Sequence, residues 1–135
     1  MKRVLWLTSW YPNSSDPYSG DFIQRQAQAV SLFQPLNVVY IGKGSLNNLP
    51  DSKIQIIDYS PDLREYALYY NTGNNIFSRL SSLYTYLKKG KEIMKLLRSK
   101  NEWPEIVHVH VAMKAGLLAV YLKWKYKIPY IVTEH

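Results

Sequence analysis

The chain has 135 residues, of which 47% are hydrophobic and 20% charged, and it contains no cysteine. This length allows one domain with a hydrophobic core but hardly two, and the composition is typical of a globular protein rather than a disordered one. The lack of cysteine excludes disulfides and thiolate metal sites and fits a reducing compartment, so we expect a cytoplasmic protein. No apolar run approaches the roughly 20 residues of a membrane-spanning helix, and the N-terminus does not resemble a signal peptide.

The net charge of +7 is concentrated in one part of the sequence. Residues 79–127 contain eleven lysines and arginines against three glutamates, whereas the rest of the chain has six basic and seven acidic residues. A one-sided basic surface attracts anionic partners such as membrane headgroups, nucleic acid or phosphorylated substrates. A solvated helix face explains the same charges equally well.

The first predicted unit is a strand, a loop and a helix. Residues 4–7 are an apolar run short enough for a buried strand, and the loop that follows holds two prolines and Gly20. From Asp21 onward, apolar residues recur at the spacing of one helix face. The backbone N–H groups at such a helix start can bind a phosphate or carboxylate. Alternatively, Gly20 only allows the chain to turn, because no phosphate-specific glycine motif is present.

Two further strands are predicted in the next part of the chain. Residues 37–41 (NVVYI) indicate a second buried strand, and residues 54–59 (IQIIDY) a third. The polar link between them is too short for a confident crossover helix, so we expect the third strand at a sheet edge, in either direction. Residues 60–75 are expected to form a surface loop with a helical turn around residues 63–70. Its tyrosines suit stacking on a sugar or, alternatively, covering the edge of the core.

Residues 76–100 predict the longest helix, with two stripes at helical spacing. The apolar stripe is expected to pack on the sheet and consists of Leu80, Leu83, Leu87, Met94 and Leu97. The basic stripe could lie on an anionic membrane and consists of Lys88, Lys91, Lys95 and Arg98.

Residues 105–111 (EIVHVHV) predict a strand in which His108 and His110 face the same side. Two such imidazoles could hold a metal ion together with His135, although no acidic residue stands nearby in sequence. The competing interpretation places His108 inside the sheet as a hydrogen-bonded core residue and His110 at the C-terminal end of the strand. We expect no metal site.

The end of the chain predicts a well-buried helix over residues 112–127 and a last strand over residues 129–133. The order of elements predicts a three-layer, Rossmann-like α/β domain with a mostly parallel, doubly wound sheet. Right-handed crossovers favour the strand order third, second, first, fourth, fifth. The first and fourth strands then lie side by side, and the residue 10–21 loop, His110, Glu134 and His135 converge on the crevice between them.

Two segments carry a family resemblance: SWYPN with DPYSGDFIQRQAQAV near the N-terminus, and EIVHVH with GLLAVYLKWKYKIPYIVTEH at the end. With these residues the chain resembles the N-terminal, acceptor-side domain of family-four glycosyltransferases, which have the two-domain GT-B fold. The resemblance implies transfer of a sugar from a nucleotide-sugar donor to a glycan, lipid-linked or small-molecule acceptor. It also implies retention of configuration and no metal or other cofactor.

The resemblance also implies roles for particular residues. His135 is the expected catalytic residue, close to the transferred sugar, and Gly20 approaches the donor diphosphate. The other expected substrate-binding residues are Trp10, Tyr11, Tyr18, Asp21, His110 and Glu134. Trp10, Tyr11 and Tyr18 would supply aromatic surface on the acceptor side.

Members of that family hold the nucleotide mainly in a second Rossmann domain, through two glutamates separated by seven residues, and this sequence contains no such pair. We therefore expect residues 1–135 to be a single domain of a longer enzyme, inactive alone and cytoplasmic or peripheral on the inner face of a membrane. The main alternative is a stand-alone flavodoxin-like module that binds a small anion. Specific nucleic-acid binding is not expected, because residues 79–127 lack a docking motif.

Overall fold

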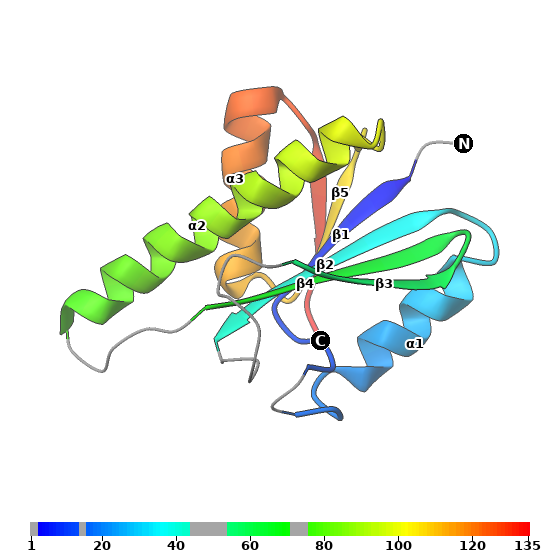
Figure 1. Ribbon diagram of the computed structural model, residues 1–135, viewed down its shortest axis with the longest axis horizontal. Helices are drawn as coiled ribbons and strands as arrows, with labels where there is room; N and C mark the ends of the chain where they lie inside the picture. Colours follow the sequence, from blue (N-terminus) through cyan, green and yellow to red (C-terminus); the bar gives the residue numbers. More distant parts are fainter. Residues whose placement is uncertain (1–2, 14–15, 44–53, 71–75) are drawn as a thin grey trace.

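A computed structural model describes residues 3–13, 16–43, 54–70 and 76–135, and it shows one six-stranded sheet with helices on both faces (Figure 1). The helices are α1 (Asp21–Val30), α2 (Ile76–Ser99) and α3 (Met113–Tyr126). The strands are β1 (Val4–Thr8), β2 (Leu36–Lys43), β3 (Gln55–Ser60), β4 (Leu63–Tyr70), β5 (Val107–His110) and β6 (Tyr130–Thr133). The predicted links over residues 44–53 and 71–75 lie outside the described residues.

The strands follow the order β3-β4-β2-β1-β5-β6 across the sheet. All neighbouring pairs are parallel except β3 and β4, which are antiparallel. β1 and β5 are adjacent, with Thr8 opposite His110 at their carboxyl ends. The fold class and the predicted neighbourhood of these two strands are therefore confirmed.

The prediction for residues 63–70 was wrong, because this segment is the strand β4 and not a loop with a helical turn. β4 lies between β2 and β3, and six of its eight residues are buried. A strand buried on both faces loses the alternation that identifies a strand in sequence. The predicted strand order was wrong for the same reason, since β4 separates β2 from the predicted third strand. That strand, β3, does lie at the edge.

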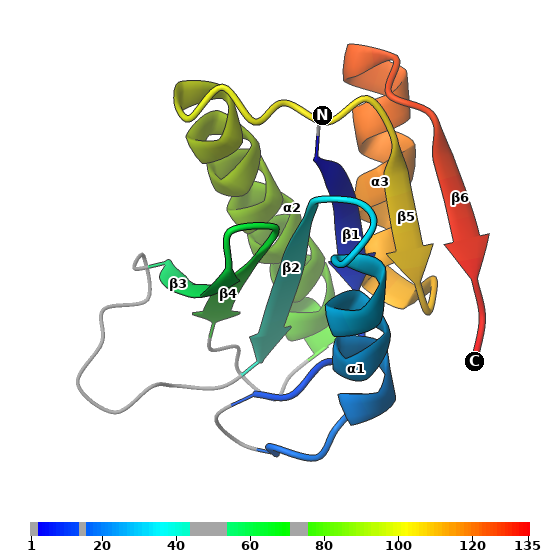
Figure 2. The same cartoon turned by 90° about the vertical axis from the view of Figure 1, so that its right-hand side faces the viewer.

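Two hydrophobic cores lie on opposite faces of the sheet (Figure 2). The larger core packs under α2 and α3 and includes Leu7 of β1 and Val109 of β5. The smaller one packs under α1 and includes Trp6 of β1 and Ile23 of α1. Alternate residues of β1 point to opposite faces, as the pleat requires. α1 sits in front of β1 and β2, on the face away from α2 and α3.

α3 is not the well-buried helix that its composition predicted. Ala115, Leu118, Ala119 and Leu122 are buried, but the opposite side is 50–72% exposed and consists of Met113, Leu117, Val120 and Trp124. A helix that is apolar on most sides does not reveal in sequence which side is covered.

In α2, Leu80 of the predicted apolar stripe is likewise 73% exposed, whereas Met94 and Leu97 are buried. None of the described helices combines the length and the apolar character needed to cross a membrane.

Candidate functional site

Gly20 begins α1 in a conformation that other residues rarely adopt. Its φ is +62°, and a Cβ atom there would lie 2.7 Å from the carbonyl carbon of Trp10. A glycine is therefore required for the β1–α1 loop to fold back on itself, which supports the turn interpretation. The first N–H groups of α1 are largely occupied: Asp21 donates to Tyr18, and Ile23 and Gln24 donate to Gly20. The structure thus gives Gly20 a backbone role and adds no support for phosphate binding there.

Asp21 lies in the first turn of α1, where a carboxylate interacts favourably with the helix dipole. Its Oδ2 atom is 3.6 Å from a guanidinium nitrogen of Arg25, in an exposed pair one helical turn apart. Such exposed pairs contribute little to stability. Of the three aromatic residues expected on the acceptor side, Trp10 is 42% and Tyr18 81% exposed, whereas Tyr11 is buried.

The carboxyl ends of β1, β5 and β6 bring His110 and His135 together. The Nδ1 atom of His110 lies 3.2 Å from Nε2 of His135, and the two rings are stacked at 7°. The Trp6 ring lies 4.0 Å from the His110 ring, and Phe22 of α1 meets His135 edge-on at 5.0 Å. The imidazole of His135 thus contacts His110 of β5 and Phe22 of α1, and Trp6 of β1 packs in turn against His110.

Burial gives His110 unusual electrostatics. Its side chain is 2% exposed, and its Nε2 atom has no hydrogen-bond partner among the described residues. Desolvation, followed by the nearby His108 and His135, lowers the pKa of His110 to about 3. The ring is therefore neutral at pH 7, so it can act as a hydrogen-bond donor or acceptor toward His135 without introducing charge.

The metal interpretation of the histidines finds no support in the geometry. His108 Nε2 lies 2.8 Å from the Thr133 hydroxyl, which matches the expectation of a hydrogen-bonded residue within the sheet. Within the part of the chain that the structure describes, no group of three His, Cys, Asp or Glu side chains is arranged to hold a metal ion.

Glu134 fixes the path of the chain between β6 and His135. Its Oε1 atom accepts a hydrogen bond of 3.0 Å from the backbone N–H of Ala112, which precedes α3. A carboxylate at this end of a helix also interacts favourably with the helix dipole. Glu134 therefore ties the end of the chain to the start of α3 and positions its neighbour His135.

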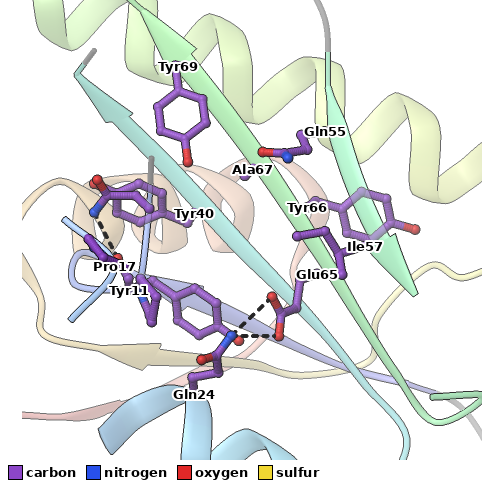
Figure 3. Close-up of a pocket in the computed structure, with 12 residues that line it drawn as sticks. Tyr11, Pro17, Gln24, Tyr40, Gln55, Ile57, Glu65, Tyr66, Ala67 and Tyr69 are labelled. Atoms are coloured by element: carbon purple, nitrogen blue, oxygen red, sulfur yellow. Dashed lines mark hydrogen bonds between the residues drawn. The ribbon is translucent and has the colours of Figure 1, made fainter. Parts of the chain in front are cut away.

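A cavity of about 270 Å³ lies beside α1, over β2, β3 and β4, and we name it the Glu65 pocket (Figure 3). The β1–α1 loop and α1 form one side of it, and the sheet forms the other. Its lining includes Tyr11, Gln24, Tyr40, Gln55, Ile57, Glu65, Ala67 and Tyr69. Of these residues, Tyr11 was expected on the acceptor side, and the tyrosines of residues 60–75, which include Tyr69, were expected either to stack on a sugar or to cover the edge of the core.

Two buried polar groups meet in the Glu65 pocket. Glu65 is 6% exposed, and Gln24 Nε2 donates to its two carboxylate oxygens at 3.2 and 3.4 Å. The Tyr11 hydroxyl lies beside them (Figure 3) but makes no hydrogen bond of ordinary geometry with the described residues. Burial and the Glu65 charge raise the pKa of Tyr11 well above its ordinary value, so this hydroxyl stays protonated.

The sequence did contain a signal for this pocket. Glu65 is the one acidic residue of the otherwise mostly apolar and aromatic segment LREYALYY, where a buried carboxylate is unusual. The signal was missed because residues 63–70 were interpreted as a loop, in which a glutamate needs no explanation.

A second cavity lies at the carboxyl edge of the sheet, near the ends of β2 and β4. Lys114 of α3 reaches into this region, and its Nζ atom donates to the Tyr70 hydroxyl at 2.9 Å and to Ser82 Oγ at 2.8 Å. Among the described residues Lys114 forms no ion pair. A partly buried cation without a carboxylate partner can attract an anion.

The comparisons with known proteins relate the chain to a glycosyltransferase at low sequence identity. No protein-family model matches the chain. The chain is 24% identical over 140 residues to the "Putative teichuronic acid biosynthesis glycosyltransferase TuaC" of Bacillus subtilis. That similarity covers 98% of this chain and 36% of the Bacillus protein, so the chain spans about a third of the length of this relative. The chain is thus a distant relative of a protein named as a glycosyltransferase.

Proposed function

We propose that the chain is the acceptor-side domain of a retaining glycosyltransferase, which moves a sugar from a nucleotide sugar to a glycan or lipid-linked acceptor. The observation that carries the proposal is the convergence of His135, His110 and Phe22 beside the adjacent carboxyl ends of β1 and β5. Ligands of open α/β sheets bind at such a switch point. The similarity to a protein named as a glycosyltransferase, over 98% of this chain, supports the same proposal.

In the proposed mechanism His135 acts on the donor sugar. Stacking on His110 and the edge of Phe22 restrict its ring, so that the imidazole is held in one orientation before the substrate arrives. Its remaining ring nitrogen then hydrogen-bonds a hydroxyl of the donor sugar or the oxygen that leaves with the nucleotide. Such a bond stabilises the charge that develops on the leaving group.

Other residues of the site have supporting roles in this proposal. Glu134 and His110 position His135, and Gly20 lets the β1–α1 loop approach the donor diphosphate. Trp10 and Tyr18 offer exposed aromatic surface to the acceptor. The nucleotide is bound mainly by a second domain of the complete protein, so the isolated chain has no transfer activity, and no metal or other cofactor takes part.

The proposed enzyme works in the cytoplasm, at the inner face of a membrane that carries its acceptor. The four basic side chains of the α2 stripe, Lys88, Lys91, Lys95 and Arg98, are all exposed. Such a row of cations attracts the anionic headgroups of a membrane.

The test is a transfer assay with the full-length gene product. A panel of UDP-, GDP- and dTDP-sugars is offered with membrane extracts as the source of acceptor, and release of nucleoside diphosphate is measured. Acceptor-dependent release with one of these donors is the expected result. No release with any donor, from a protein that is folded by circular dichroism, would contradict the proposal.

A second candidate function is a small-anion-binding module, and the environment of Lys114 favours it. This cation lies at the carboxyl edge of the sheet, with hydroxyl groups of Tyr70 and Ser82 around it. Calorimetric titration with inorganic phosphate and with nucleotides separates the two functions. Tight binding by residues 1–135 alone, lost in Lys114→Met, would support the module and contradict the transferase domain.

A further inference from the structure

We propose that the Glu65 pocket binds one sugar ring of the acceptor, a neutral pyranose that donates hydroxyl groups to Glu65 and lies against Tyr40 and Tyr69. That the ligand belongs to the acceptor rests on the proposed transferase function. That the ligand is a neutral sugar is inferred from the residues of the pocket. The pocket belongs to the face of the sheet covered by α1 (Figures 2 and 3).

The buried carboxylate is the first observation that points to a ligand. A carboxylate has about four lone-pair sites, and a buried one is costly unless donors fill them. Among the described residues, the side-chain hydrogen bonds of ordinary geometry to Glu65 come from the amide nitrogen of Gln24, which is shared between the two Glu65 oxygens at 3.2 and 3.4 Å. The Tyr11 hydroxyl, which lies close to this carboxylate, is a second donor. The described residues supply no cation to Glu65. Glu65 therefore retains accepting capacity next to an open cavity.

The second observation is the Tyr11 hydroxyl. It is buried in the lining of the same cavity and has no hydrogen bond of ordinary geometry with the described residues. A protonated hydroxyl can donate and accept at once. Together with Glu65 and Gln24 it makes a row of mixed donors and acceptors (Figure 3), which suits the adjacent hydroxyl groups of a sugar.

The walls of the cavity fit the apolar part of a sugar ring. Tyr40 and Tyr69 meet edge to face with ring centroids 6.2 Å apart, and both line the pocket together with Ile57 and Ala67. Aromatic and apolar side chains with a few placed polar groups are typical of small-ligand sites. The volume of about 270 Å³ lies just below the roughly 300–1,000 Å³ of typical small-ligand sites, so we infer room for one ring rather than for a chain of sugars.

The charges in the pocket exclude anionic ligands. No lysine, arginine or histidine is among the described residues that line it, and its one formal charge is the carboxylate of Glu65. A phosphate or a uronate would be repelled by this carboxylate. A ligand with an ammonium group would pair with Glu65, but the neutral amides and hydroxyls around it match a neutral polyol better.

The position of the pocket predicts which kinetic constant it controls. Gln24 of α1 contacts Glu65, whereas Phe22 of the same helix contacts His135. The pocket and the proposed catalytic histidine therefore lie on different sides of α1. A sugar in the pocket is a remote part of the acceptor, so losing its contacts raises KM more than it lowers kcat.

The test measures sugar binding and transfer in the full-length protein. Ligand-observed NMR with methyl glucoside, methyl galactoside, methyl mannoside, methyl N-acetylglucosaminide, glucosamine and inorganic phosphate gives affinities without a nucleotide sugar. Glu65→Gln keeps the shape and removes the charge, and Tyr11→Phe removes one hydroxyl. Ala67→Leu fills the cavity with apolar atoms. The matched control is Asp62→Asn, an equal charge change on an exposed residue outside the pocket.

We expect at least one neutral glycoside to bind, about tenfold more weakly after Glu65→Gln and several-fold more weakly after Tyr11→Phe. Ala67→Leu abolishes binding, Asp62→Asn leaves it unchanged, and melting temperatures show that all variants are folded. Binding of glucosamine or phosphate alone overturns the proposal, as does an affinity that no pocket variant alters. If the full-length protein transfers sugar and its acceptor KM is unchanged in all three pocket variants, the pocket proposal is contradicted and the transferase proposal stands. If glycosides bind but no transfer occurs with any donor, the transferase proposal is contradicted and the sugar-binding site stands.

Discussion

The imidazoles of His110 and His135 are stacked at 7°, and Nδ1 of His110 lies 3.2 Å from Nε2 of His135. Twenty-four residues separate these two histidines in the sequence. Because β5 and β6 are parallel neighbours in register, their carboxyl ends meet, and His110 lies opposite Thr133, two residues before His135. A buried neutral ring therefore orients an exposed one.

The first prediction concerns acid stability. The pKa of His110 is lowered to about 3 in the folded chain, whereas an unfolded histidine has its ordinary value near 6.5. Between these values the unfolded state binds the proton and the folded state does not, so acidification favours unfolding. We expect the free energy of unfolding to fall from pH 6.5 toward pH 3, with a contribution from His110 of up to about 1.4 kcal/mol per pH unit.

Urea unfolding at a series of pH values measures this slope. In His110→Phe the titrating group is gone while an aromatic ring remains against Trp6, so the stability curve of the variant is flatter over the same range. The effect of His110 is contradicted if the two curves stay parallel below pH 6.5.

The second prediction concerns turnover. His135 is exposed and follows the last strand, so His135→Ala removes only its ring contacts with His110 and Phe22 and buries no new group. We expect turnover of the full-length enzyme to fall by about 100-fold, the scale of one lost transition-state hydrogen bond, with an unchanged melting temperature. His108→Gln is the control, since His108 bonds Thr133 and lies further from the proposed donor site. Equal activity of the His135→Ala and wild-type enzymes would remove His135 from the mechanism.

The third prediction concerns the start of α1. Gly20→Ala places a Cβ atom at φ +62° and 2.7 Å from the Trp10 carbonyl carbon, so the loop must shift. We expect a loss of about 1–3 kcal/mol in the free energy of unfolding. Gly116→Ala is the matched control, because its Cβ would meet a single atom, Ala112 Cβ at 3.2 Å, and alanine favours a helix. Chemical denaturation compares the two, and equal effects would show that Gly20 has no special backbone role.

The fourth prediction concerns a charged cluster at the amino end of the sheet. Glu102, after α2, accepts from Arg64 at 2.6 Å and from Asn37 at 3.0 Å, and Arg3 lies 3.6 Å away. Glu102→Ala leaves the Arg64 and Asn37 donors without this acceptor in a largely buried place. We expect a loss of about 2–3 kcal/mol, less than for a fully buried pair because the side chains of Arg64 and Glu102 are 21% and 16% exposed.

Thermal unfolding of Glu102→Ala and Glu105→Ala checks this value. Glu105 is three residues further along, exposed and of the same type, so it controls for the loss of a carboxylate. A loss no larger than that of Glu105→Ala would mean that the cluster contributes little.

Much of the fold was predictable because apolar runs and prolines mark its elements. β1, α1 and β5 were placed to within a few residues, and their order alone implied that β1 and β5 are neighbours. The convergence of His110, Glu134 and His135 followed from topology, since parallel strands end at the same edge.

The Glu65 pocket was not predictable in the same way. It depends on the hairpin of β3 and β4, which inserts β4 beside β2, and on the packing of Gln24 from α1 over that strand. The sequence of β4 lacks alternation, so neither the strand nor the direction of Glu65 could be inferred. The exposure of Trp124 on α3 was missed because composition does not reveal which side of an apolar helix is covered.

The last prediction concerns the basic stripe of α2. Lys88, Lys91, Lys95 and Arg98 are exposed, and Arg98 also lies 4.4 Å from the Trp103 ring centroid. Replacing Lys88, Lys91 and Lys95 by glutamine removes three cations without touching the Arg98 contact. Each lysine near an anionic surface contributes about 1 kcal/mol, so we expect binding of the full-length protein to vesicles with 30% phosphatidylglycerol to weaken by about 100-fold. Replacing Lys123 and Lys125 of α3, together with Lys127 just after it, is the control with the same change in net charge. A purely global charge effect would weaken binding equally in both triple variants. Vesicle sedimentation at low and high salt distinguishes the two, and equal losses would show that the α2 stripe is not the face that meets the membrane.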